Sequence, residues 1–294
     1  MNQIEKIVQI IWYSNNKITK SILVFLLPLS IIYYLLFTLR KKFISPKSFG
    51  TNIVCVGNCS VGGDGKTSTI LSILKLYKLR NKNVAVLLKG YKGRIKEPTL
   101  VIKNKHTAID VGDEALLYTE HTNTFVSNDR LKGVSFIINN YSPDVILLDD
   151  GMQDFRIKKD KNILVVNGAR GFGNRLLLPM GPLRQLPSSA IKMADLVILI
   201  GNSFDTVFKS YESELNEKIF VNAEIRCEMN TLTNSYFAFS GIGNNQNFIN
   251  TLKTNNYNLF KFKSFPDHYN YSNNDIDNIK QEAKENNLKI ITTE

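Results

Sequence analysis

The sequence has few of the side chains that build disulfide frameworks and metal sites. Its 294 residues include three cysteines, Cys55, Cys59 and Cys227, and three histidines. The cysteines are too few and too scattered for a disulfide framework or a four-cysteine zinc site, which favours a reducing compartment. Three histidines likewise argue against a histidine-rich metal centre.

Acidic residues are in deficit, whereas apolar residues are plentiful. The chain has 37 Lys and Arg against 26 Asp and Glu, a net charge of +11, which points to an anionic partner: nucleic acid, anionic lipid or a phosphorylated substrate. Charge alone does not choose among these. The hydrophobic share of 43% excludes a chain that is disordered by composition. At ~100–200 residues per domain, the length corresponds to two domains.

Charge is absent altogether from one segment near the N-terminus. Ser21–Leu39 has nineteen residues without a charged side chain, and a helix of that length, at about 1.5 Å per residue, matches the hydrocarbon thickness of a bilayer. Arg40, Lys41 and Lys42 follow, with no small-residue cleavage site, which disfavours a signal peptide. We therefore predict a retained membrane anchor over residues 1–44, spanning or lying in the interface, with the following chain in the cytoplasm.

Beyond this segment, short apolar runs alternate with helical stretches. Near-continuous apolar runs are typical of parallel strands buried on both faces. They predict a doubly wound α/β domain over residues 45–201 and, from weaker strands, a smaller α/β lobe over residues 202–294. The predicted strands are Asn52–Gly57, Asn83–Leu88, Asp144–Leu148, Asn162–Asn167 and Asp195–Ile200, and in the second lobe Phe237–Phe239, Lys261–Phe265 and Lys289–Thr292.

A glycine-rich segment between the first strand and a helix carries the strongest chemical signal. Residues 57–67 read GNCSVGGDGKT. Backbone N–H groups of such a loop surround phosphate oxygens at a helix N-terminus, with Lys66 reaching the β- and γ-phosphates and the Thr67 hydroxyl ligating Mg²⁺. The strict phosphate-loop pattern has glycine where Ser60 stands. The predicted nucleotide-binding residues are Ser60, Val61, Gly62, Gly63, Asp64, Gly65, Lys66, Thr67 and Ser68.

Two adjacent carboxylates end a later strand. The run DVILLDDG, residues 144–151, places Asp149 and Asp150 after an apolar stretch. One carboxylate can orient Mg²⁺ while its neighbour faces the other way and acts as a base. Alone, this pair reads as an ordinary polar strand end, but its combination with the phosphate loop favours the catalytic interpretation.

Several motifs together resemble the tetraacyldisaccharide 4′-kinase family, the lipid A 4′-kinases. The stretch RGFGNRLLLPMGPLR at residues 170–184 is the most specific, and Ser60 agrees with this family's loop. The resemblance runs from the anchor almost to the C-terminus. The other motifs are VGDE at 111–114, DDGMQ at 149–153, SGIGN at 240–244 and FPDHY at 265–269.

The resemblance implies an enzyme that transfers the γ-phosphate of ATP to the 4′-hydroxyl of a tetraacyldisaccharide 1-phosphate, giving lipid IVA in lipid A biosynthesis. It implies ATP and Mg²⁺ as cofactors, and a P-loop NTPase fold with an N-terminal membrane helix. The implied partners are the acylated disaccharide 1-phosphate and a membrane surface, with neither nucleic acid nor an obligate protein partner. The implied location is the cytoplasmic face of the inner membrane of a Gram-negative bacterium.

The resemblance also assigns the residues on the metal side of the site. Lys66 and Thr67 hold the phosphates and magnesium. Asp149 is the metal-side acid of the strand end. Asp113 of the VGDE motif adds an acidic group near the metal.

On the side of the acceptor sugar, the resemblance makes Asp150 the base toward the hydroxyl. His268 of the second lobe is its partner in a dyad, which requires the lobe to close over the substrate. Arg184 stabilises phosphate charge. Further pocket residues are Arg170, Asn174 and Arg130.

Four features depart from the family pattern. Gln185 stands where the family has glutamate, so a metal role there is in doubt. Lys89 replaces an arginine and loses its bidentate fork, and Asp154 replaces a basic residue or a histidine. The family sequence continues beyond Glu294, so we expect a shortened second lobe, with an open effect on activity.

Two other functional classes fit parts of the sequence. A membrane-tethered assembly or partitioning ATPase would share the GGDGKT core, although Val61 stands where such proteins have a characteristic lysine. A non-enzymatic membrane-binding module would account for the basic charge but would leave the phosphate loop and the paired carboxylates without a use.

Overall fold

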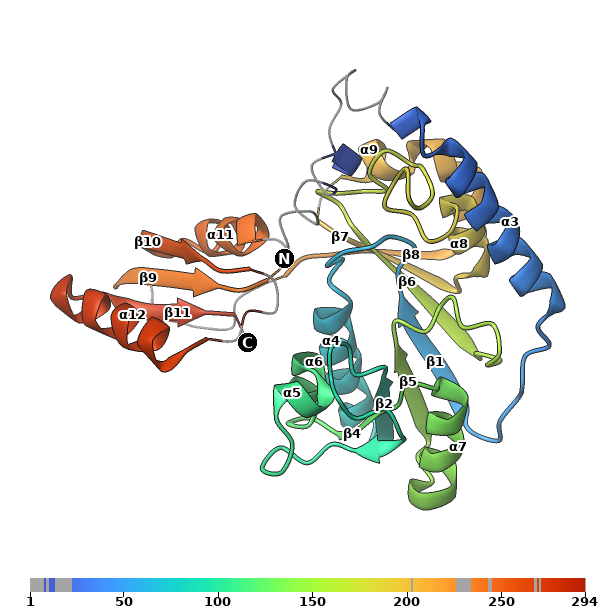
Figure 1. Ribbon diagram of the computed structural model, residues 1–294, viewed down its shortest axis with the longest axis horizontal. Helices are drawn as coiled ribbons and strands as arrows, with labels where there is room; N and C mark the ends of the chain where they lie inside the picture. Colours follow the sequence, from blue (N-terminus) through green and yellow to red (C-terminus); the bar gives the residue numbers. More distant parts are fainter. Residues whose placement is uncertain are drawn as a thin grey trace. The chain divides into compact units, whose positions relative to one another are not determined.

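A computed structural model of the chain describes residues 8, 11–13, 23–201, 203–225, 234–242, 245–266, 269 and 271–293 (Figure 1). The chain divides into two compact units. The larger unit is Gln9–Ala223, and the smaller one comprises Glu224–Glu294 together with Met1–Val8.

The larger unit is built on an eight-stranded sheet with the order β3-β4-β2-β5-β1-β6-β7-β8. All neighbouring strands are parallel except β3, which is antiparallel to β4. The five strands predicted for this unit are confirmed, each to within a residue at its ends. The strands are β1 (Asn52–Gly57), β2 (Val84–Leu88), β3 (Thr99–Leu100), β4 (Asn123–Val126), β5 (Val145–Asp149), β6 (Lys161–Asn167), β7 (Leu196–Ile200) and β8 (Ile219–Ala223).

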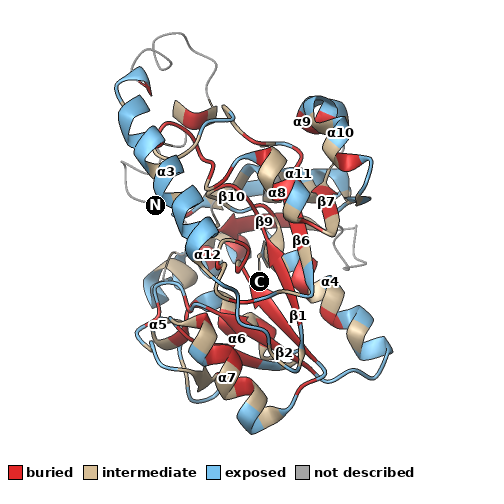
Figure 2. Ribbon diagram, turned by 90° about the vertical axis from the view of Figure 1, so that its right-hand side faces the viewer, coloured by how far each residue is buried: buried red, intermediate tan, exposed pale blue. Residues whose placement is uncertain are grey.

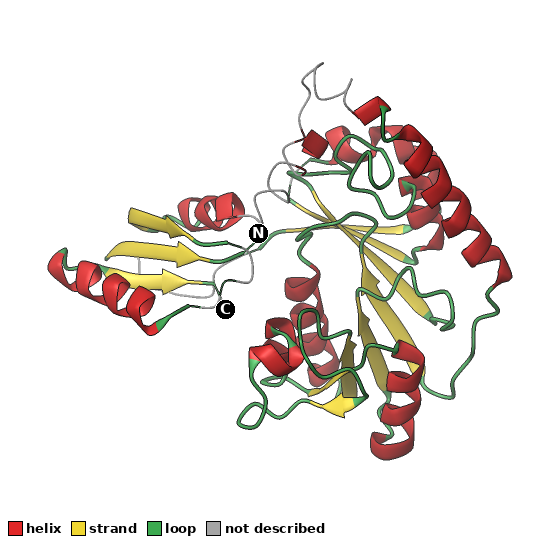
Figure 3. Ribbon diagram, in the orientation of Figure 1, coloured by secondary structure: helices red, strands yellow, loops and turns green. Residues whose placement is uncertain are grey.

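The central strands are buried on both faces, as their apolar runs indicated. Along β1, Ile53 and Cys55 belong to one hydrophobic cluster, whereas Val54 and Val56 belong to another. Because successive side chains point to opposite faces of a sheet, the two clusters are its two apolar layers. Figure 2 shows most of these strands as buried, and Figure 3 shows helices on both sides of the sheet.

Each apolar layer is completed by its own helices. Side chains of α4 and α6 join the cluster of Val54, and side chains of α7 and α8 join the cluster of Ile53. The unit is therefore a doubly wound α/β fold. Its helices after the first strand are α4 (Lys66–Leu79), α5 (Ala108–Val111), α6 (Asp113–Tyr118), α7 (Arg130–Tyr141), α8 (Pro187–Met193), α9 (Phe204–Phe208), the 3₁₀ helix η1 (Lys209–Tyr211) and α10 (Glu212–Leu215).

Helix α3 (Leu27–Phe43) precedes the sheet and has an unusual distribution of side chains. Pro28 lies in its first turn, where proline's missing N–H costs nothing, so the helix starts inside the predicted Ser21–Leu39 segment. Ser30 is its buried residue, whereas Leu29, Leu35 and most other apolar side chains are exposed. Among the described residues, no helix has both the length and the apolar character needed to cross a bilayer, so the spanning helix is not confirmed.

The smaller unit has a three-stranded parallel sheet with the order β10-β9-β11. Phe237 and Phe239 pack on one face, and Tyr236 and Ala238 on the other. Ser272 caps the last helix in a capping box. The elements are β9 (Ser235–Ser240), α11 (Asn245–Thr254), β10 (Asn258–Ser264), α12 (Asn273–Glu285) and β11 (Lys289–Thr292).

Candidate active site

The predicted site residues of the larger unit gather at the carboxyl edge of its sheet. Strand β1 lies between β5 and β6, where the strand order changes direction. Ligands of open α/β sheets bind in the crevice outside the carboxyl ends of the strands at such a switch point. The glycine-rich loop (residues 58–65) follows β1, and Asp149 ends β5.

The glycine-rich loop leads directly into α4. Gly65 is the N-cap of α4 with φ +87°, a backbone conformation that side chains other than glycine rarely adopt. A Cβ there would also come within 2.3 Å of Ile200 Cδ1, so the Ile200 side chain would have to move. Lys66 and Thr67 form the first turn of α4, where unpaired backbone N–H groups and the helix dipole favour an anion. Of the predicted nucleotide-binding residues 60–68, Gly63 and Ser68 are exposed.

Polar contacts inside the glycine-rich loop explain two of its unusual residues. Asp64 is buried and accepts hydrogen bonds from the Asn58 amide and the Ser60 hydroxyl. Glycine at position 60 could not make the second bond. Gln153 Nε2 donates to the Asn58 carbonyl at 2.8 Å, which ties the loop to the segment after β5. The Asp64 carboxylate is thereby satisfied within the loop.

A second loop, the bridging loop (residues 176–184), lies against the glycine-rich loop. The Val61 N–H donates to the Pro182 carbonyl at 2.8 Å, and the Arg184 N–H donates to the Cys59 carbonyl at 2.7 Å. The motif that carries the family resemblance is thus hydrogen-bonded to the predicted phosphate loop.

Asp150 forms ion pairs with two cations of the site, Lys66 and Arg184. Its Oδ1 lies 3.7 Å from Lys66 Nζ, and its Oδ2 accepts a 2.7 Å hydrogen bond from Arg184. Burial opposes its ionisation, but Lys66 and Arg184 outweigh burial and lower the pKa of Asp150 to about 2. The buried Arg130 donates from Nη2 to the carbonyls of Asp149 and Asp150, both at 2.8 Å. These contacts fix the end of β5.

The surroundings of Asp149 shift its pKa in the opposite direction to that of Asp150. Burial, with a contribution from the Glu114 charge, raises the pKa of Asp149 to about 7. The Tyr118 hydroxyl donates to Asp149 Oδ2 at 3.0 Å, and the Thr67 hydroxyl donates to Glu114 Oε1 at 3.0 Å. Hydroxyl and carboxylate oxygens are the donors that Mg²⁺ prefers, so Thr67 and Asp149 fit such an ion.

In the described part of the chain, no group of three or more His, Cys, Asp or Glu side chains could hold a metal ion. Magnesium in kinases is typically held by one or two protein groups together with substrate phosphates and water.

Two predicted residues lie near the site's edge with other partners. Arg170 has its guanidinium 5.8 Å from the Tyr13 ring centroid, and a Cβ on Gly62 would come within 2.8 Å of its Nη1. Asn174 donates to the Met180 carbonyl at 2.9 Å, so it shapes the bridging loop.

The VGDE motif leads into α6, which carries the expected Asp113 and two residues that the motifs did not assign, Glu114 and Tyr118. Asp113 is exposed at the first residue of α6. Glu114 and Tyr118, which contact Thr67 and Asp149, were missed. Their spacing of four residues places them on one face of a helix, and that was the available signal. Predicted catalytic His268 lies outside the described residues, so the dyad stays a prediction.

Two residues that depart from the family pattern, Gln185 and Asp154, accept hydrogen bonds from nearby side chains. Gln185 is 1% exposed and accepts a 3.2 Å hydrogen bond from Gln153. A neutral amide at this depth avoids an unpaired buried charge. Asp154 accepts two hydrogen bonds from the Arg156 guanidinium, at 2.9 and 2.8 Å. Lys89 is exposed.

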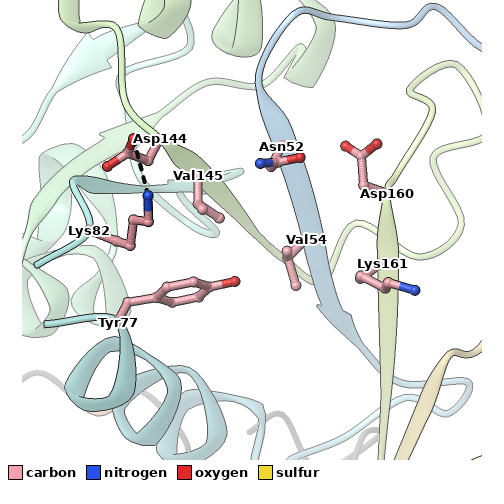
Figure 4. Close-up of a pocket in the computed structure, with 8 residues that line it drawn as sticks. All are labelled: Asn52, Val54, Tyr77, Lys82, Asp144, Val145, Asp160 and Lys161. Carbon is pink, nitrogen blue, oxygen red and sulfur yellow. Dashed lines mark ion pairs between the residues drawn. The ribbon is translucent and has the colours of Figure 1, made fainter. Parts of the chain in front are cut away.

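Neither of two cavities in the larger unit is lined by residues of the glycine-rich loop. One, of about 330 Å³, is drawn in Figure 4 and includes the Lys82–Asp144 ion pair (3.9 Å). It lies at the amino edge of the sheet, opposite the gathered site residues. Its lining is Asn52, Val54, Tyr77, Lys82, Asp144, Val145, Asp160 and Lys161. The other, of about 200 Å³, is lined by residues 168–173 with Arg175, Thr206 and Val207.

Comparisons with known proteins agree with the motifs. Residues 22–294 match the family model of tetraacyldisaccharide-1-P 4′-kinase. The tetraacyldisaccharide 4′-kinase of Rickettsia typhi is 40% identical over 269 residues, 91% of this chain and 83% of that protein. The Rickettsia canadensis protein of the same name is 40% identical over 271 residues, 91% and 82% of the two chains. The crystal structure of LpxK from Aquifex aeolicus in complex with ATP is 28% identical with a TM-score of 0.70, covering 92% of this chain and 88% of that one.

Because burial disfavours the charged form of Asp149, we expect Asp149→Asn to stabilise the nucleotide-free protein by ~1–4 kcal/mol at pH 8. The pKa in the folded state, about 7, exceeds the unfolded value of about 3.9. The gain should therefore be largest above about pH 7 and decline progressively toward about pH 4. Thermal denaturation in EDTA at pH 8 and pH 5 measures it. Asp205→Asn, at an exposed carboxylate of α9, is the control, and an equal Tm difference at both pH values would contradict the expectation.

Proposed function

The chain belongs to the tetraacyldisaccharide-1-P 4′-kinase family, and from that premise we propose how its site carries out the reaction. It is a kinase that transfers a phosphoryl group from ATP to the 4′-hydroxyl of a tetraacyldisaccharide 1-phosphate in lipid A biosynthesis. The observation that carries the proposal for the site is the cluster of Lys66, Arg184 and Asp150 beside the glycine-rich loop.

We propose that the glycine-rich loop holds the ATP phosphates and that Lys66 and Arg184 follow the charge of the transferred group. Phosphoryl transfer spreads negative charge over the three equatorial oxygens of the phosphoryl group, so cations placed beforehand accelerate it. In this structure Asp150 holds both cations. The phosphates would take its place as their counter-ion.

We propose that Thr67 and Asp149 hold Mg²⁺ together with the nucleotide, and the bound ion would neutralise charge on the β- and γ-phosphates. Glu114 contributes by accepting the Thr67 hydroxyl hydrogen bond, which orients the oxygen of Thr67. Tyr118 orients the Asp149 carboxylate in the same way.

Two carboxylates can act as the base toward the sugar hydroxyl. Asp150, the residue indicated by the motifs, has a buried Oδ1 that accepts no hydrogen bond from the described residues, which suits an incoming hydroxyl. However, its pKa of about 2 makes it a weak base while Lys66 and Arg184 pair with it. Asp113 is exposed beside Glu114, which contacts Thr67. We therefore propose that Asp150 orients the hydroxyl and the cations, that Asp113 takes the proton, and that His268 of the smaller unit assists.

Lys66→Ala should nearly abolish phosphoryl transfer, because the transferred group loses one of the two cations proposed to stabilise its charge. The measurement is transfer of ³²P from γ-labelled ATP to a tetraacylated disaccharide 1-phosphate in detergent micelles. Lys78→Ala, at an exposed position near the end of the same helix, should keep wild-type activity. Equal activity of the two variants would place the nucleotide elsewhere, and an inactive wild type would contradict the proposed substrate.

The choice of base is tested with two isosteric variants. Asp113→Asn should lower kcat by ~10²–10⁴ with little change in the KM for ATP, as expected for a lost general base. Asp150→Asn should lower kcat and raise the KM for ATP as well, because Lys66 and Arg184 lose their partner. Near-normal turnover of Asp113→Asn would assign the base role to Asp150, and His268→Ala should then show a loss that is not additive with that of Asp150→Asn.

We propose that α3 attaches the larger unit to the membrane surface that holds the lipid substrate. Leu36 and Leu29 of α3 are 62% and 53% exposed, and Phe25, just before the helix, is 85% exposed. The last turn of α3 carries Arg40, Lys41 and Lys42. An apolar helix face followed by basic residues is typical of a helix lying in the interface of an anionic membrane. The membrane would be the inner one of a Gram-negative bacterium, approached from the cytoplasm.

Leu36→Glu should weaken binding to vesicles that contain phosphatidylglycerol, because a charge replaces an apolar side chain at the membrane boundary. Co-flotation of the full chain with the vesicles measures binding. Leu79→Glu is the matched control, since Leu79 is 81% exposed on α4 and outside this surface. Equal flotation of both variants and the wild type would contradict the role of α3.

A further inference from the structure

The bridging loop is hydrogen-bonded on two sides. On one side it meets the glycine-rich loop through Val61 and Cys59. On the other side it meets α3, where the Ser30 hydroxyl donates to the Leu177 carbonyl at 3.2 Å and accepts from the Met180 N–H at 3.2 Å. Helix α3 is therefore separated from the glycine-rich loop by a single hydrogen-bonded segment.

A second contact of α3 reaches a residue of the proposed catalytic machinery. The Tyr33 hydroxyl donates to the backbone carbonyl of Arg184 at 2.7 Å. Ser30 and Tyr33 are three residues apart, so they lie on the same face of the helix. Tyr33 is half-buried on a helix whose other side chains are mostly exposed. Burial also raises its pKa, so the hydroxyl remains a donor at neutral pH.

Arg184 is thus held at three points. Its carbonyl accepts from Tyr33, its N–H donates to Cys59, and its guanidinium reaches Asp150. The backbone bonds set the position from which the guanidinium extends. Misplacement of a catalytic group by about 1 Å can cost up to ~10²-fold in rate, so such a backbone constraint has a kinetic effect.

We propose that Tyr33 is a positioning residue for phosphoryl transfer, which holds the backbone of Arg184 so that the guanidinium meets the transferred phosphate. The packing of α3 against the bridging loop is then part of the catalytic geometry as well as part of the attachment to the membrane. This inference rests on the proposed role of Arg184.

Tyr33→Phe keeps the ring and removes only the hydroxyl. We expect kcat to fall about tenfold, within the range for a displaced catalytic group, while the KM for ATP changes less than twofold. Tyr34→Phe removes a hydroxyl from the next residue of α3, whose side chain is exposed. This control should turn over like wild type. A normal kcat for Tyr33→Phe would overturn the inference.

Two further measurements distinguish a positioning role of Tyr33 from a merely structural one. Ser30→Ala loosens the same helix without touching Arg184, so Tyr33→Phe should lose more activity than Ser30→Ala for an equal or smaller fall in Tm. In an Arg184→Ala background, Tyr33→Phe should have no further effect on kcat, because both changes act through one group. Independent multiplication of the two losses, or activity that falls only in step with Tm, would overturn the positioning role.

The same variants distinguish failure of the inference from failure of the proposed site. If Arg184→Ala lowers kcat strongly but Tyr33→Phe does not, only the positioning role fails. If Arg184→Ala keeps full activity, the proposed catalytic role of Arg184 fails, and the role of Tyr33 fails with it.

Discussion

The ion pairs of Asp150 join three segments that are far apart in the sequence, and the geometry of the site depends on them. Lys66 begins α4, Asp150 follows β5, and Arg184 ends the bridging loop. Two cations this close together repel each other unless an anion lies between them. Asp150 supplies that anion in this structure, and under the proposed role of Lys66 and Arg184 it holds both cations where the phosphates would bind.

The sheet makes this meeting possible. Parallel strands that are buried on both faces end at a common edge, and β1 and β5 are direct neighbours in register. Arg130 then closes the end of β5 by binding two successive carbonyls from a buried position. The apolar layers therefore hold the strands, and charged hydrogen bonds at the edge hold the loops that carry chemistry.

In a usual amphipathic helix the apolar side chains face the protein, whereas in α3 they are exposed. Its contacts with the bridging loop are made by the hydroxyls of Ser30 and Tyr33, whereas its leucines and isoleucines are exposed. Exposed apolar side chains at this density mark an interaction surface. A substrate with four acyl chains is itself confined to a membrane, so the hydrogen bond from Tyr33 of α3 to Arg184 would connect the proposed membrane-binding surface with the proposed catalytic site.

Local pattern was enough to predict β1, the glycine-rich loop, the start of α4 at Lys66 and the acidic end of β5, because each depends on neighbouring residues: apolar runs, glycine at positive φ and a helix N-terminus. Strand β8 was missed because, as an exposed edge strand, it has an apolar run of only three residues, Ile219, Phe220 and Val221. The ion pairs of Asp150, the burial of Gln185 and the bond from Tyr33 to Arg184 were decided only by the tertiary structure. These contacts join residues up to 151 positions apart, and no local periodicity encodes which distant side chains the packed sheet brings together.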